Sequence, residues 1–330
     1  MTMRGEAIEA EPETAALLAA MVTDFAGAPA DPTVEERRAG LAAAAELYGP
    51  PPALVGSMVQ AEARGPSGSV PLRVYTAAGT ADGLRPLVLH IHGGGWVLGG
   101  PEAYERVARA YCAAGDCVLV DVDYRRAPEH KHPAALEDCL AALDWAVRNA
   151  RKLGADPRRI VVTGDSAGGH LAAAVCQTSS RAIALQLLVY PVMDASPAAN
   201  WPSRKALGDG RFFLREFDIL RAEQEYFTED QTGQRLVAPA SPVRAAAGVL
   251  RRLPPTVVIT AGLDPLVDEG AAYAAAIRAA GGRAEDLRFD GTIHAFVMFA
   301  GRLSAGRRAI QEIGARIRAA RPARGRWFGL

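Results

Sequence analysis

The sequence predicts an α/β protein with a mostly parallel β-sheet that helices cover on both faces. The chain has 330 residues, of which 49% are hydrophobic and 22% charged, as is ordinary for a globular protein. From about residue 70 onward, extended apolar stretches alternate with helical patterns, which is typical of parallel strands joined by crossover helices. One long interval between two strand patterns breaks this alternation and predicts an inserted segment.

The first 56 residues predict helices that precede the sheet. Ala and Glu recur at helical spacing in Thr14–Met21 and Thr33–Leu47, and the pattern stops at Gly49-Pro-Pro-Pro52. We expect residues 1–56 to form an N-terminal helical cap segment and residues 57–330 to form the main domain.

Seven extended stretches predict strands of the sheet. Helical patterns of suitable length lie between several of them. The strands are expected at Val70–Tyr75, Leu87–His92, Cys117–Tyr124, Ile160–Thr163, Leu185–Tyr190, Thr256–Ala261 and Ala284–Phe289, and the helices at Pro133–Leu153, Ala167–Thr178 and Glu269–Ala280.

The interval from Asp194 to about Leu250 is too long for a simple crossover helix, and Leu214–Tyr226 has a helical pattern of its own. We expect a cap insertion at about residues 195–245. Together with the N-terminal helices it would cover the carboxyl ends of the strands, where open α/β sheets bind their ligands.

Charge and cysteine content narrow the class of protein. Lys plus Arg equals Asp plus Glu at 37 each, so the chain has no net positive charge that would attract nucleic acid or an anionic membrane. We therefore expect a small, roughly neutral ligand. The four cysteines show neither CxxC nor metal-ligand spacing and are expected to stay reduced. The N-terminus becomes acidic instead of apolar, and no apolar run approaches the ~20 residues that span a bilayer. These observations predict a cytoplasmic protein.

Ser166 is the candidate nucleophile. Gly164, Ser166 and Gly168 form a GxSxG pattern between a predicted strand and a helix of small residues. A strand that turns sharply into a helix strains the serine backbone, and only glycine fits two residues away on either side. The alternative is a serine that merely caps the helix.

A serine nucleophile needs a base, and His294 is the candidate. In this topology the order is Ser, Asp or Glu, then His, which excludes the four histidines that precede Ser166. His170 lies one helical turn after the serine and is too close to come from a separate loop. His294 remains, in a Gly-containing loop just after a strand pattern.

The candidate acid is Asp264, immediately after the strand Thr256–Ala261. It would hold His294 in the correct tautomer and stabilise the imidazolium. Asp268 and Glu269 are interpreted as the acidic first turn of the next helix. Asp264 before Pro265 is alternatively a turn signal.

Three consecutive glycines follow the strand Leu87–His92 and expose backbone N–H groups. We expect the N–H groups of Gly94, Gly95 and Ala167 to form an oxyanion hole. His92, with Gly93 and Asp165, is expected to support this loop. A flexible glycine loop or a phosphate cradle is the alternative, although no GK[ST] follows.

These segments resemble the hormone-sensitive lipase family of α/β-hydrolases, also called bacterial family IV esterases. The resemblance implies an α/β-hydrolase fold with an eight-stranded sheet under a helical cap, no cofactor or metal, and hydrolysis of short- to medium-chain acyl esters through a Ser166, Asp264 and His294 triad. It also allows a homodimer. Arg126 stands where many relatives have an aliphatic residue. The matching segments are His92-Gly-Gly-Gly-Trp96, Tyr124-Arg-Arg-Ala-Pro-Glu129 with Pro133-Ala-Ala-Leu-Glu-Asp138, Gly164-Asp-Ser-Ala-Gly-Gly169, Asp264-Pro-Leu-Val-Asp-Glu269 and His294-Ala-Phe296.

Three other functions are compatible with parts of the sequence. The pairs His90-Ile-His92 and His130-Lys-His132 suggest a metal hydrolase, but no further cluster of ligands follows either pair. A non-catalytic small-molecule receptor on the same scaffold would not need an activated nucleophile. An amide deacetylase or lactonase would use the same triad. Candidate pocket walls are Trp96, Trp201, Phe212 and Phe213.

Overall fold

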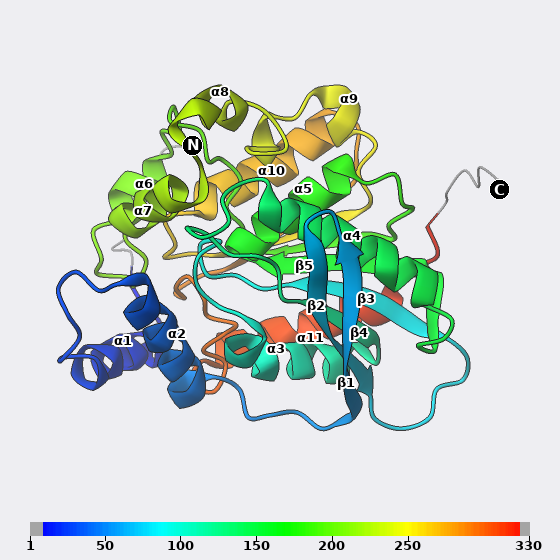
Figure 1. Ribbon diagram of the computed structural model, residues 1–330. Helices are drawn as coiled ribbons and strands as arrows, with labels where there is room; N and C mark the ends of the chain where they lie inside the picture. Colours follow the sequence, from blue (N-terminus) through cyan, green and yellow to red (C-terminus); the bar gives the residue numbers. More distant parts are fainter. Residues whose placement is uncertain (1–8, 324–330) are drawn as a thin grey trace.

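The computed structural model describes residues 9–323, and its centre is one eight-stranded sheet in the order β1-β2-β4-β3-β5-β6-β7-β8 (Figure 1). Strands β3 to β8 are parallel to one another, whereas β1 and β2 join the edge next to β4 as antiparallel strands. This arrangement confirms the predicted α/β class and the eight strands. The strands are β1 Val55–Gly65, β2 Gly68–Ala77, β3 Arg85–Ile91, β4 Val118–Val122, β5 Ala155–Asp165, β6 Leu185–Val189, β7 Thr256–Ala261 and β8 Ala284–Phe289.

Strand β1 is absent from the sequence prediction, and the expected domain boundary at residue 56 falls inside it. It lies at the edge of the sheet and pairs only with β2. Most of its side chains are exposed, so the strand lacks the apolar alternation that a half-buried strand shows.

Helices cover both faces of the sheet. Helices α3 (Pro101–Gly115) and α11 (Ser304–Ala319) lie on one face, and α4 (Ala134–Asn149), α5 (Ala167–Thr178) and α10 (Val267–Ala279) lie on the other (Figure 1). The buried apolar side chains form two clusters, one on each face of the sheet. Within β3, for example, Val88 packs in the cluster of the α3 face, whereas Leu87 and Leu89 pack in that of the α5 face. Strands buried on both faces explain the continuous apolar runs in the sequence.

Two segments lie beside each other at one end of the molecule. The N-terminal segment contains α1 (Pro12–Asp24) and α2 (Val34–Tyr48), and the insertion contains α6 (Pro202–Leu207), α7 (Glu216–Tyr226) and α8 (Thr232–Arg235), before the short helix α9 (Ala247–Leu250) (Figure 1). Helix α2 begins with a capping box, in which Thr33 and Glu36 bond each other's backbone N–H. The segments meet where Arg37 of α2 donates two hydrogen bonds to Glu225 of α7, at 2.5 and 3.1 Å.

The four cysteines, Cys112, Cys117, Cys139 and Cys176, are free and buried, as expected. Within residues 9–323, no helix combines the length and the apolar character needed to cross a membrane.

Candidate active site

Four of the predicted site segments follow the carboxyl ends of parallel strands. Gly94 follows β3, Ser166 follows β5, Asp264 follows β7 and His294 follows β8. Carboxyl ends of parallel strands meet at one edge of a sheet, so segments far apart in the sequence converge there.

Ser166 occupies a tight turn between β5 and α5. Its backbone has φ 55° and ψ −121°, a conformation that costs energy for a residue with a side chain. The flanking glycines make the turn possible. A Cβ on Gly164 would lie 2.3 Å from the carbonyl oxygen of Gly168, and a Cβ on Gly168 would lie 2.1 Å from that of Ile91. The backbone N–H of Ser166 donates to the carbonyl of Val189, 2.9 Å away, which fixes the turn on the sheet.

Ser166, His294 and Asp264 lie in one chain of hydrogen bonds. His294 Nε2 lies 2.9 Å from Ser166 Oγ, and His294 Nδ1 lies 2.6 Å from Asp264 Oδ2. An ionised carboxylate only accepts hydrogen bonds, so Nδ1 carries the proton and Nε2 is free to accept the serine proton. Asp264 is fully buried and also accepts the N–H of Leu266 at 2.9 Å, which fixes its orientation.

The two other acids considered for this role make different contacts. Asp268 accepts the backbone N–H of Ser203 at 2.9 Å. Glu269 is fully buried and accepts the N–H groups of Met193 and Asp194 at 2.6 and 2.8 Å. Both lie in the first turn of α10, as expected. The sequence does not reveal the burial of Glu269, whose carboxylate also pairs at 2.9 Å with buried Arg204 of the insertion.

The glycine loop after β3 has a left-handed backbone over three residues, with φ 107° at Gly94, 61° at Gly95 and 61° at Trp96. A Cβ on Gly94 would lie 2.6 Å from the backbone of Leu98, so the turn requires glycine there. Among residues 9–323, no hydrogen-bond acceptor is recorded for the N–H groups of Gly94, Gly95 or Ala167. These three N–H groups are therefore free to donate to a ligand, which an oxyanion hole requires.

The expected supporting residues contact this loop. Asp165 accepts the N–H of Gly93 at 3.0 Å and the hydroxyl of Tyr104 at 3.0 Å. Burial raises the pKa of Asp165. His92 Nδ1 lies 2.8 Å from the carbonyl oxygen of Gly93. Arg126, for which the sequence offers no role, donates a hydrogen bond to the carbonyl of Gly99 at the far end of the loop.

The HxH pairs do not gather a set of metal ligands. His90 Nδ1 lies 2.7 Å from Asp121 on the neighbouring strand, His130 is exposed, and His132 Nδ1 lies 3.3 Å from the hydroxyl of Tyr226. Across the described part of the chain, no group of three or more His, Cys, Asp or Glu side chains could hold a metal ion. The metal-hydrolase alternative therefore lacks the convergent ligands that it needs.

Three histidines away from the triad are expected to make the stability depend on pH. Burial lowers the pKa of His92, His132 and His170 from 6.5 to about 4. Between pH 4 and 6.5 the unfolded chain binds more protons than the folded chain, because the buried histidines of the folded chain stay neutral. Their contribution to the free energy of unfolding is therefore complete above pH 6.5 and is lost as the pH falls toward 4. We expect the drop in the thermal midpoint between pH 7.5 and 5.5 to be smaller in His170→Gln than in wild type. The exposed His130→Gln is the control, and equal drops in both variants would contradict this account.

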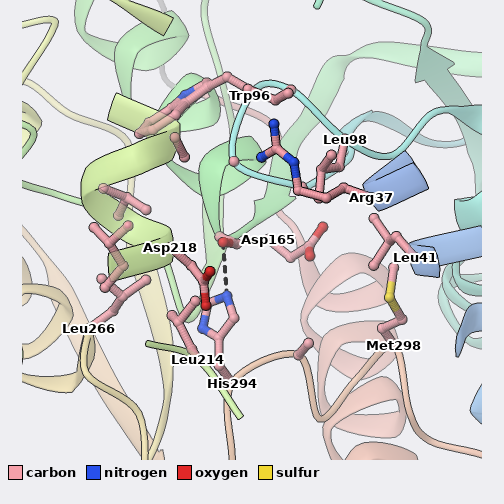
Figure 2. Close-up of a pocket in the computed structure, with 18 of the residues that line it drawn as sticks. Arg37, Leu41, Trp96, Leu98, Asp165, Leu214, Asp218, Leu266, His294 and Met298 are labelled. Atoms are coloured by element: carbon pink, nitrogen blue, oxygen red, sulfur yellow. Dashed lines mark hydrogen bonds between the residues drawn. The ribbon is translucent and has the colours of Figure 1, made fainter. Parts of the chain in front are cut away.

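A cavity of about 260 Å³ adjoins Ser166 and His294 (Figure 2). Its walls are mainly apolar and come from the glycine loop, α2, the insertion and the segments that follow β7 and β8. Trp96 and Phe213 line it as expected, but Trp201 and Phe212 do not. Phe212 is instead buried in the apolar cluster of the α3 face. Several other wall residues are not predicted from the sequence, namely Arg37, Leu41, Leu98, Leu214, Leu266 and Met298.

The chain matches one family model in sequence, and it is similar to several esterases in sequence and in structure. A family model described as the α/β-hydrolase fold matches residues 88–298. LipN of Mycobacterium tuberculosis, a carboxylic ester hydrolase, is 40% identical over 71% of this chain, and the match spans 62% of LipN. The carboxylesterase NlhH of the same organism is 38% identical, over 70% of this chain and 72% of NlhH. The structure of an ester hydrolase from the metagenome of Lake Arreo superposes with a TM-score of 0.87 at 34% identity, over 94% of this chain and 98% of that one.

Proposed function

This chain belongs to the α/β-hydrolase family, in its hormone-sensitive-lipase type, and we propose that it is a serine carboxylesterase acting on short- to medium-chain acyl esters. The hydrogen-bonded chain from Asp264 through His294 to Ser166, beside an apolar cavity, carries the proposal. Its carboxylesterase relatives support the same reaction.

In the proposed mechanism, Ser166 Oγ attacks the ester carbonyl while His294 Nε2 takes its proton. Asp264 stabilises the imidazolium that forms. The N–H groups of Gly94, Gly95 and Ala167 donate to the oxyanion of the tetrahedral intermediate. The intermediate collapses, the alcohol leaves with the proton from His294, and an acyl-enzyme on Ser166 remains. Water then attacks the acyl-enzyme with His294 as base, and the acid is released.

The walls of the cavity support a small neutral ester as substrate. Its charged lining residues already have partners, since Arg37 pairs with Glu225 and Asp218 pairs with Arg215. The remaining walls are mainly Leu, Met, Phe and Trp side chains, which favour an acyl chain or an apolar alcohol. A cavity of about 260 Å³ suits a short or medium acyl chain better than a long one.

Hydrolysis of p-nitrophenyl esters, from acetyl to palmitoyl, tests this function. We expect kcat/KM to be highest for short and medium chains and to fall for the longest, because the cavity cannot enclose them. The matched p-nitroanilides and a set of lactones test the alternative reactions. A folded enzyme that leaves all the esters intact would overturn the proposal, and faster cleavage of an anilide or a lactone would reassign it.

Three broader proposals accompany this function. The N-terminal helices α1 and α2 and residues of about 195–245 act as a cap, which is supported by the presence of Leu41 and Leu214 in the walls of the cavity. Residues 1–8 of the expected cap segment lie outside the described residues. The balanced charge supports a small-molecule partner without nucleic acid, and the four free, buried cysteines support a cytoplasmic location. A homodimer is proposed from the family resemblance, and the mass of the protein in solution tests it.

A further inference from the structure

Arg38 of α2 reaches from the N-terminal segment to the glycine loop of the candidate oxyanion hole. Its Nε donates to the carbonyl of Val97 at 2.9 Å, and its Nη2 donates to the carbonyl of Ala127 at 3.1 Å. The same guanidinium forms two hydrogen bonds of 2.8 Å to the two carboxylate oxygens of Glu129. One side chain thus joins the glycine loop to the segment after β4.

Val97 is tied directly to the candidate donors. The N–H groups of Val97 and Leu98 both donate to the carbonyl of Gly94, at 3.1 and 2.7 Å. That carbonyl belongs to the same peptide unit as the N–H of Gly95. A shift of Val97 therefore turns the peptide whose N–H is expected to bind the oxyanion.

The loop needs support because its own conformation is unfavourable. Trp96 has a φ of 61°, which costs energy for any residue other than glycine. From the interior, Asp165 holds Gly93, and the N–H of Ala127 donates to the carbonyl of Trp96 at 3.0 Å. Arg38 bonds the carbonyls of both Val97 and Ala127, so it fixes the loop and its internal support together.

We infer that Arg38 is a positioning residue for the oxyanion hole. It touches neither substrate nor nucleophile, and it acts by fixing the orientation of the Gly95 N–H through Val97. This inference rests on the proposed function, because it assumes that Gly94 and Gly95 bind the oxyanion. Helix α2 would then help to stabilise the transition state through Arg38, and it also forms a wall of the cavity.

The contact pattern favours this role over a simple anchor for α2. Another α2 contact, in which Arg106 of α3 donates to the carbonyl of Glu46 at 3.2 Å, ties the helix to the main domain without reaching the glycine loop. Lysine at position 38 would carry the charge but could not present the planar fork that reaches two carbonyls and a carboxylate together.

The test compares Arg38→Met and Arg38→Lys with Arg106→Met on the best ester substrate. We expect kcat of Arg38→Met to fall by about 10- to 100-fold, less than the roughly 100- to 1000-fold loss typical of deleting an oxyanion-hole donor. KM should change by less than about threefold, because the loop contributes mainly to the transition state. Arg38→Lys should recover part of the loss, and Arg106→Met should keep nearly wild-type kcat.

A trifluoromethyl ketone supplies a second readout, since it forms a tetrahedral adduct that mimics the intermediate. Its inhibition constant should rise in proportion to the loss of kcat/KM in the Arg38 variants. Equal kcat in Arg38→Met and Arg106→Met, or a higher KM with unchanged kcat, would show that Arg38 only anchors the helix. If Arg38→Met does not fold, Arg38→Lys and Glu129→Gln carry the same comparison, and wild-type kcat in both would overturn the inference. An inactive wild-type enzyme would instead refute the proposed function, and this inference with it.

Discussion

Replacing Ser166 with Ala is expected to lower kcat by about 10⁴-fold or more, because it removes the hydroxyl that lies 2.9 Å from His294 Nε2. The fold should survive. Alanine keeps the Cβ that the turn already accommodates, and the Ser166 backbone N–H still bonds Val189. Steady-state hydrolysis of the best p-nitrophenyl ester measures the loss, and thermal unfolding checks the fold.

Ser179→Ala is the matched control, since Ser179 follows the same helix, α5, at its opposite end. It should retain wild-type turnover. A Ser166→Ala variant within a few-fold of wild type would contradict the assignment of the nucleophile.

Replacing Asp264 with Asn is expected to lower kcat by about 10⁴-fold, because an amide no longer selects the tautomer that leaves His294 Nε2 unprotonated. The shape of the side chain is kept, so the buried position should still pack. The loss is measured near pH 7.5.

Asp268→Asn tests whether the effect is specific to position 264. Asp268 is a nearby acid in the first turn of α10, and its carboxylate accepts the backbone N–H of Ser203. We expect its kcat to stay within about threefold of wild type, because the triad is intact. Losses of similar size in both variants would mean that the acid is misassigned.

Much of the fold is predictable because its parallel strands are buried on both faces. Their continuous apolar runs and the helices between them identify β3 to β7. The antiparallel strand β2 and the more exposed edge strand β8 are also predicted, from their extended stretches. Strand β1 is not predictable in this way, because it lies at the edge with mostly exposed side chains. Its role is set by the pairing with β2, a tertiary contact that periodicity does not report.

The candidate triad is predictable because the chemistry needs particular residue types in a particular chain order. The supporting contacts are different, since they join residues far apart in sequence. Arg38 lies 59 positions before Val97, and Arg37 lies 188 positions before Glu225. On a helix, such arginines are indistinguishable from a solvated charged face. The aromatic candidates show the same limit, because Phe213 lines the cavity whereas its neighbour Phe212 packs in the core.

The most direct test of the central claim is covalent labelling with a fluorophosphonate, followed by mass spectrometry of the intact protein and of its peptides. This reagent phosphonylates an activated serine. We predict one adduct per chain, on the peptide that contains Ser166, with esterase activity lost in step with labelling. Ser166→Ala should take up none. An active enzyme that is not labelled, or an adduct on another residue, would contradict the account.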